Sequence, residues 1–213
     1  METSASDALA LSPDGRPRCY WAASPEYESY HDREWGRPVV TDDGFFERLC
    51  LEGFQSGLSW LTILRKRPAF RAAFAGFHVA AVARFGPADV ERLMNDAGIV
   101  RNRRKIEAAV NNAARCVEVI DDCGSVAALV WRFRPDDPPP PIRSRAGWPA
   151  VTPESKALAA ELRRRGFQFV GPTTAYATMQ AAGLVNDHAE GCYVRDEVER
   201  LQRDAAARLT GNG

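Results

Sequence analysis

The chain has 213 residues, of which 45% are hydrophobic, and its 28 basic and 28 acidic side chains give a formal net charge of zero. This length suits one domain or two closely packed lobes with an ample core. The balanced charge neither favours nor excludes a polyanionic partner, so the distribution of charge along the chain carries more information.

The first seventeen residues are small, polar and rich in Pro and Gly, and we expect them to form a disordered tail. They lack the apolar segment of a secretory signal, and no apolar run in the sequence approaches the length of a membrane span. The five cysteines, an odd number without an export signal, favour reduced thiols over a disulfide framework. The expected compartment is therefore the cytoplasm.

Helical patterns dominate the rest of the chain, which predicts an all-α fold. Helices are expected at residues 42–56, 58–67, 69–74, 87–96, 104–116, 126–133, 153–165, 173–182 and 197–208. Asp42 or Asp43 would cap the first helix, and Pro68 would end the second. Gly166 would stop the helix that begins at Pro153, in a left-handed conformation. The proline-rich residues 134–151 predict a loop, and residues 167–170 could form a short extended piece.

Glu52 lies on an apolar stripe of the first predicted helix. Phe45, Leu49 and Glu52 are spaced i, i+4 and i+7 and so share one face. An unpaired carboxylate in a core costs several kcal/mol, on the order of the penalties for buried ions. One interpretation is a local salt bridge or a capping acceptor, and the other is a pocket acid that a ligand completes.

Aromatic residues gather on both sides of this acid in the sequence. Each alone is more often a core residue than part of a binding site, but five near one buried acid favour a binding slot. Such a slot suits a flat ring that is cationic or bears an amine, through stacking and charge-assisted hydrogen bonds. The five are Trp21, Tyr27, Tyr30, Trp35 and Trp60.

Two helical patterns meet at Ala97, Gly98 and Ile99. The short connection predicts a tight hairpin in which Gly98 supplies a permissive backbone. The second helix then starts with a basic run: Asn102, Arg103, Arg104 and Lys105. Free N–H groups at a helix start, together with cations, form a phosphate site. This pattern is that of a helix-hairpin-helix clamp on a DNA backbone, and an ordinary turn is the alternative.

A candidate metal site joins the two ends of the chain. His188 and Cys192 are spaced i, i+4, so on a helix their donor atoms would point the same way. Cys19 and His31 would complete a Cys2His2 set suited to tetrahedral zinc. Four protein ligands would make the site structural, a staple between the N-terminal segment and the C-terminal region. The alternative is two buried free thiols and two hydrogen-bonded histidines.

Four long segments of the sequence match one family pattern. They are CYWAASPEYESYHDREWG at 19–36, LEGFQSGLSW at 51–60, DAGIVRNRRKI at 96–106 and FVGPTTAYATMQAAGLVNDH at 169–188. Together they resemble the 3-methyladenine DNA glycosylase I family of the constitutive bacterial type, over about residues 18–193. Ser56 stands where the family usually has alanine, and the hairpin lacks the Pro-Gly sequence common in the wider superfamily.

The resemblance implies an all-α, helix-hairpin-helix DNA glycosylase with one structural Zn2+ that staples its N- and C-terminal regions. It implies a glycosylase domain at 18–193 with the hairpin at about 88–116. The expected tail at 1–17 and an expected C-terminal helical extension at 194–213 lie outside the resemblance. The implied protein is a bacterial, cytoplasmic monomer that works on the nucleoid, with double-stranded alkylated DNA as its partner and no membrane association.

Family roles can be carried over residue by residue. The implied zinc ligands are Cys19, His31, His188 and Cys192, and the implied catalytic acid is Glu52. Tyr30 and Trp60 would hold the flipped base, and Trp21, Tyr27 and Trp35 would line its pocket. Gly57 and Leu58 would lie near the gap that the flipped nucleotide leaves. The hairpin residues Gly98, Arg103, Arg104 and Lys105 would contact DNA.

The implied reaction is hydrolysis of the N-glycosidic bond of 3-methyladenine during base-excision repair. A base alkylated at N3 is cationic, so its glycosidic bond is already weak and no strong general acid is required. The superfamily's aspartate after the hairpin has no clear match, which places more of the chemistry on Glu52. No lysine adjoins Glu52 in its motif, which favours a monofunctional enzyme that uses water. The alternatives are a catalytically silent, zinc-stabilised DNA-binding module and a small-molecule enzyme with an aromatic pocket.

Overall fold

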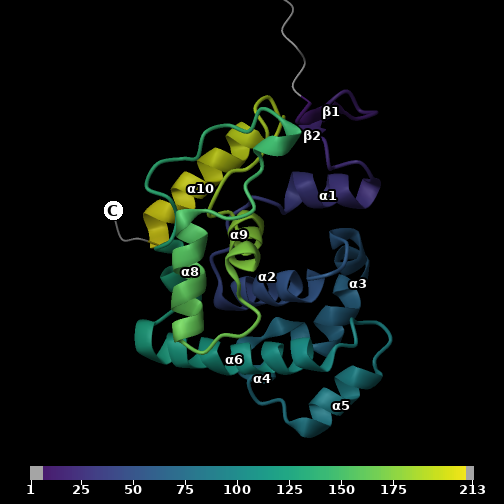
Figure 1. The fold of residues 1–213 in the computed structure, drawn as a ribbon, viewed down its shortest axis with the longest axis vertical. Coiled ribbons are helices and arrows are strands. Elements are labelled where there is room, and N and C mark those ends of the chain that lie inside the picture. Colours follow the sequence, from purple (N-terminus) through teal and green to yellow (C-terminus); the bar gives the residue numbers. More distant parts are fainter. Residues whose placement is uncertain (1–6, 210–213) are drawn as a thin grey trace, which may run out of the picture.

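The computed structural model describes residues 7–209, and helices make up most of it, as the all-α prediction requires (Figure 1). The helices are α1 (Pro25–Arg33), α2 (Asp42–Gln55), α3 (Trp60–Ala73), α4 (Val79–Val82), α5 (Pro87–Asn95), α6 (Arg103–Cys123), α7 (Val126–Trp131), α8 (Pro153–Arg164), α9 (Pro172–Ala181) and α10 (Arg195–Leu209). Two 3-10 turns lie at Ala75–Phe77 and Arg145–Gly147. Within residues 7–209, no helix is both long enough and apolar enough to span a bilayer.

The N-terminal segment is more ordered than the predicted tail. Strands β1 (Leu9–Leu11) and β2 (Pro17–Cys19) pair antiparallel, with Leu9 opposite Cys19. Arg18 on β2 is 4% exposed and donates to Asp14 in the turn and to Asp32 of α1, at 2.7 and 2.8 Å. Three-residue strands are too short to show an alternating pattern, so the sequence did not reveal them. Residues 1–6 of the expected tail lie outside the described residues.

Helix α2 lies near the middle of the fold and packs against α3, α6, α7 and α9 (Figure 1). More than half of its residues are buried, so it presents apolar side chains around much of its circumference. Its N-cap is Thr41, whose hydroxyl accepts from the backbone N–H of Gly44, and not Asp42 or Asp43 as predicted. The Asp42 carboxylate instead accepts from Ser125 and Ala127 at the start of α7.

Helix α3 continues through Pro68, which corrects the predicted break between two helices at 58–67 and 69–74. Pro68 is exposed, so the hydrogen bond that its missing N–H would have made falls on the solvent side. Ile63 and Phe70 are fully buried on the opposite side. Burial of that face holds the helix together across the proline.

Residues 96–102 connect α5 to α6 and pack on α3. Gly98 in this connection was predicted to adopt a backbone conformation that favours glycine, but its φ is not positive. A Cβ at Gly98 would lie 2.8 Å from the Ala69 Cβ, so this position requires glycine for space and not for conformation. The Lys66 ammonium of α3 donates to the carbonyls of Ala97 and Gly98. Helix α6 itself runs seven residues past its predicted end at 116, because Cys116 and Val119 extend its buried face.

The C-terminal half follows the predicted pattern more closely. Helix α8 ends before Gly166, which has a φ of 85° as predicted, and packs against α9. Residues 167–170 do not form an extended piece, because Phe169 has a φ of 54°. On α10, the Gln202 amide donates to the carbonyls of Gly36 and Val185 and so fixes this helix to the rest of the fold.

Candidate functional site

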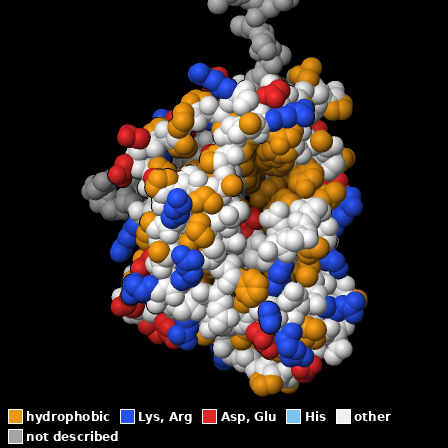
Figure 2. All heavy atoms as spheres, in the orientation of Figure 1, with side chains coloured by type: hydrophobic (Ala, Val, Ile, Leu, Met, Phe, Trp, Pro, Cys, Tyr) orange, Lys and Arg blue, Asp and Glu red, His pale blue; other side chains and the backbone are white. Residues whose placement is uncertain are grey.

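A cavity of about 400 Å³ lies between α1, α2, α3, α9 and the loop after α7. Figure 2 shows this face of the molecule, with a hollow to the right of centre lined by hydrophobic side chains. The cavity brings together Glu52 and all five predicted aromatic residues. Its lining is Trp21, Tyr27, Tyr30, Trp35, Glu52, Gln55, Trp60, Trp148, Pro149, Ala177 and Gln180.

Helix α1, absent from the predicted elements, positions the two tyrosines. Its N-cap is Ser24, whose hydroxyl accepts from the Tyr27 N–H, and Pro25 begins its first turn. The Tyr27 hydroxyl accepts from the Leu61 N–H in the first turn of α3, which connects the two helices. Tyr30 therefore lies beside Trp60, with ring centroids 5.3 Å apart and planes inclined by 51°.

Trp21 and Trp35 form another wall of the cavity. Their rings meet edge to face with centroids 4.9 Å apart, and Trp21 packs in the same way on Tyr27 at 5.9 Å. Edge-to-face contacts of this kind fix ring orientation in addition to burying apolar area. The wall is therefore assembled before any ligand arrives.

Glu52 projects from α2 into this aromatic surround and is 7% exposed. No hydrogen bond from residues 7–209 reaches its carboxylate, which rules out the interpretation of a capping acceptor or a local salt bridge. Burial raises the pKa of Glu52 to about 8, and the positive charge of Arg48 opposes the rise only in part. The side chain is a pocket acid that lacks a hydrogen-bond partner in the described part of the chain.

Two other polar groups near Glu52 are also held away from water. The Trp60 indole N–H is buried and has no acceptor among the described residues. Burial, and secondarily the nearby Glu52 charge, raise the pKa of the Tyr30 hydroxyl. A buried polar group without a partner is costly, so the Trp60 N–H favours a ligand with a polar edge.

The sequence did not reveal the far wall of the cavity, formed by Trp148 with Pro149 and by Ala177 with Gln180. Asp187, 3% exposed, organises this wall: its carboxylate accepts from the Gln180 amide at 2.7 Å and from the Tyr176 hydroxyl at 2.6 Å. Its backbone carbonyl accepts from the Trp148 indole. Burial raises the pKa of Asp187. The feature of the sequence that could have indicated this role of Asp187 is the Asn-Asp-His motif at 186–188.

The four predicted metal ligands meet in one buried cluster. The donor atoms of Cys19, His31, His188 and Cys192 all lie within 4.8 Å of one another. His188 Nδ1 is 3.2 Å from His31 Nε2 and 3.7 Å from Cys192 Sγ, and Cys192 Sγ is 3.4 Å from His31 Nε2. This cluster could hold a metal ion.

His188 and Cys192 do not lie on a helix, which corrects the reason given for their pairing. They lie in the turn between α9 and α10, where Gly191 has a φ of 82°. The turn still directs both donor atoms toward His31 of α1. His31 Nδ1 lies 2.8 Å from the Asp32 carboxylate, an outer contact typical of metal-bound histidine.

The predicted DNA contacts occupy one region, but their side chains differ in availability. Arg103 is paired with Glu91 at 2.7 Å. The Lys105 ammonium donates to the carbonyls of Phe54 and Ser56 and so holds the end of α2 and the following loop. Arg104 is exposed. In that loop, Gly57 has a φ of 83° and Leu58 is 41% exposed.

Comparison with known proteins gives consistent matches. A family model of methyladenine glycosylases matches residues 20–196. DNA-3-methyladenine glycosylase 1 of Escherichia coli (strain K12) is 44% identical over 177 residues, covering 82% of this chain and 95% of that protein. A crystal structure of 3-methyladenine DNA glycosylase I superposes with a TM-score of 0.79 at 45% identity, covering 83% of this chain and 98% of the other. The same enzyme from Staphylococcus aureus, whose structure addresses 3-methyladenine recognition, gives 0.77 at 34% identity, covering 81% and 93%.

Proposed function

Because the chain belongs to the methyladenine glycosylase family, we propose that it excises 3-methyladenine from alkylated DNA with Glu52 as the acid that recognises the cationic base. It is a DNA-3-methyladenine glycosylase of base-excision repair. The observation that carries the role of Glu52 is its burial, without a hydrogen-bond partner from residues 7–209, in a cavity walled by aromatic rings.

Recognition begins when the damaged nucleotide leaves the duplex stack and its base enters the cavity. Extrusion costs a few kcal/mol, and the cost is lower for a damaged base. The Tyr30 and Trp60 rings offer apolar faces to the base, while the other aromatic residues exclude water. A purine fits the cavity volume of about 400 Å³.

The charge of the base then determines the state of Glu52. With the pKa of Glu52 near 8, the empty cavity holds this carboxyl mostly protonated at neutral pH. A cationic ring nearby favours the carboxylate, because opposite charges at short range in a dry site attract strongly. The resulting carboxylate accepts from the exocyclic amine of the base. A neutral adenine offers no such compensation, which accounts for discrimination.

Bond cleavage requires little further activation. The glycosidic bond of an N3-alkylated adenine breaks with its electron pair leaving on the base, which neutralises the ring. The sugar becomes oxocarbenium-like, and water adds to it to leave an abasic site. The Glu52 carboxylate stabilises positive charge in this dry cavity during the step.

We assign the metal cluster to structural zinc. Zinc bonds of about 2.0 Å to nitrogen and 2.3 Å to sulfur at tetrahedral angles separate neighbouring donors by about 3.3 to 3.8 Å. Four of the six donor separations in the cluster, at 3.2, 3.4, 3.7 and 3.8 Å, lie in this range or within about 0.1 Å of it. Zinc would supply a rigid cross-link and no catalytic water, because all four positions are filled by protein.

The cluster also supports the cavity directly. The Trp35 ring packs on the His188 imidazole with centroids 4.7 Å apart, and Trp21 packs on His31 at 5.3 Å. Two of the four tryptophans that line the cavity, Trp21 and Trp35, therefore rest on two of the proposed zinc ligands. Loss of the metal would loosen this wall.

DNA is held, in this proposal, by a helix-hairpin-helix element formed by α5 and α6. The free N–H groups at the start of α6 and the exposed Arg104 contact phosphates. Lys105 acts indirectly, by holding the loop that presents Leu58 to the gap in the stack. The protein acts on double-stranded DNA as a monomer.

The test is release of free base from methylated duplex DNA, with products identified by chromatography. Free 3-methyladenine and intact strands bearing abasic sites are expected. Damage-independent binding without base release would instead support a silent DNA-binding module. Folded protein with neither binding nor release would leave a small-molecule enzyme as the better account.

A further inference from the structure

Phe169 is exposed on the surface in a conformation that phenylalanine seldom adopts. It follows α8 in the loop to α9, has a φ of 54° and is 45% exposed. A bulky side chain at positive φ is strained, and such strain concentrates at functional positions. Neither the cavity nor the metal cluster involves Phe169.

The surrounding loop is held by buried groups, so this exposure is built into the fold. The amide of Asn112 on α6 is 4% exposed and both accepts from the Gln168 N–H and donates to the Gln168 carbonyl, at 2.8 and 3.0 Å. Phe167 and Val170 on either side of this pair are each 3% exposed. The loop therefore anchors its neighbours in the core and presents Phe169 to solvent.

Phe169 lies close to the loop already assigned to the DNA gap. It lines a shallow surface depression together with Phe54 and Lys105. The same Lys105 ammonium holds the Ser56 carbonyl, two residues before Leu58. Leu58 and Phe169 are two of the four large apolar side chains exposed among residues 7–209. Leu58 and Phe169 therefore both lie near Lys105 in the structure, although one precedes it and the other follows it in the sequence.

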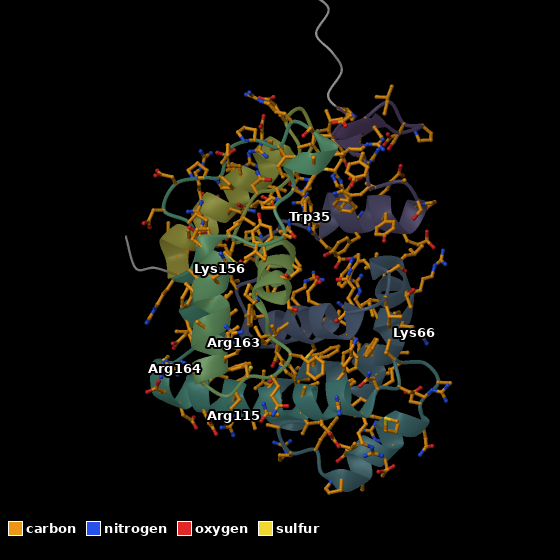
Figure 3. All side chains as sticks on the ribbon, in the orientation of Figure 1. Trp35, Lys66, Arg115, Lys156, Arg163 and Arg164 are labelled. Carbon is orange, nitrogen blue, oxygen red and sulfur yellow. The ribbon has the colours of Figure 1, made fainter. Side chains whose placement is uncertain are left out.

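Two cationic side chains lie on α8, the helix that precedes this loop. Lys156 and Arg163 are spaced i, i+7, are both exposed, and make no ion pair with any described residue. Figure 3 shows both on α8, along the face onto which the hollow of Figure 2 opens. The neighbouring Arg164 differs, because Glu161 pairs with it at 2.6 Å. Arg163 lies in the last turn of α8, next to the loop that carries Phe169, and Lys156 lies about two turns earlier on the same helix. Unpaired cations along this helix complement phosphates, and the exposed aromatic ring complements an unstacked base.

We propose that Phe169, with Lys156 and Arg163, forms a second DNA contact on the α8 side of the cavity. Phe169 stacks on a base that loses its neighbour when the damaged nucleotide is extruded, and the two cations bind backbone phosphates. Base–aromatic stacking tolerates any sequence, as a lesion search requires. This inference rests on the proposed glycosylase function.

The experiment measures affinity for a duplex with one abasic-site analogue and for the undamaged duplex, across a salt series, together with base release from methylated DNA. Phe169→Ala is expected to weaken abasic-duplex binding about tenfold. Phe169→Trp, which keeps an aromatic face, should retain most of the binding. Leu11→Ala is the matched control, because Leu11 is 75% exposed on the N-terminal hairpin.

The double variant Lys156→Ala/Arg163→Ala should weaken both duplexes alike and reduce the salt slope by about two, since two phosphate contacts are lost. Arg200→Ala/Arg208→Ala on α10 removes the same charge from another exposed helix and should leave the slope unchanged. If Phe169→Ala matched Leu11→Ala while base release by the unaltered protein was intact, this inference would be wrong and the glycosylase function would stand. Absence of base release from the unaltered protein would overturn the function itself.

Discussion

Replacing Glu52 by glutamine tests its proposed role through stability as well as activity. An acid whose pKa is raised on folding loses its proton first from the unfolded chain, so rising pH favours unfolding until the folded protein also ionises. With a pKa of 4.5 in the unfolded chain and about 8 in the fold, this penalty starts near pH 4.5 and saturates above pH 8. Glutamine preserves the shape and removes the penalty.

The magnitude follows from these two pKa values. Glu52→Gln should stabilise the protein by about 1 kcal/mol at pH 5, about 3 at pH 7 and about 4 at pH 8. Urea denaturation followed by tryptophan fluorescence, at each pH on both proteins, gives this difference directly. Other titrating groups cancel in the comparison. Excision of 3-methyladenine, measured on the same samples, should fall severely in the variant.

Glu118→Gln is the control, because Glu118 is 56% exposed and lies on another helix. It should change stability by well under 1 kcal/mol, with no trend in pH. A stability difference for Glu52→Gln that stayed flat from pH 5 to 8 would refute the buried acid. Excision close to that of the unaltered protein would show that the carboxylate charge is not part of the reaction.

Three further predictions follow from the same geometry. Cys192→Ser should lower the zinc content, measured by elemental analysis, from about one per chain and lower the melting temperature; a metal-free protein of unchanged stability would contradict the zinc assignment. Gly98→Val should destabilise the protein by about 1 to 3 kcal/mol in urea, because the added carbons meet the Ala69 Cβ; unchanged stability would show that the connection gives way freely. Trp60→Ala should abolish the preference for methylated over undamaged DNA in competition binding while leaving overall duplex affinity largely intact, whereas equal loss for both duplexes would place Trp60 in the DNA clamp.

Much of the helical fold could be predicted because helical periodicity and its end signals are local. A proline after a cap predicts where a helix begins, and Gly166 predicts where α8 ends, without any tertiary information. The errors arose where tertiary packing outweighed local preference. Pro68 remains inside α3 because Ile63 and Phe70 are buried on the opposite side. The β1–β2 hairpin depends on the Arg18 contacts to Asp14 and Asp32, which no short pattern reveals.

The residues of the candidate site show the same difference between what local sequence predicts and what tertiary contacts decide. Glu52 could be identified because its charged side chain occupies the apolar face of its helix. This departure from the helical pattern is visible in the sequence. Lys105 was assigned to phosphate because it belongs to a basic run, yet its ammonium holds the Phe54 and Ser56 carbonyls. The sequence did not indicate a role for Phe169, because the residue type alone does not distinguish an exposed phenylalanine from a buried one. Sequence reasoning therefore finds residues that violate a local rule, while residues whose role depends on a neighbour's carbonyl or on a single φ value require the structure.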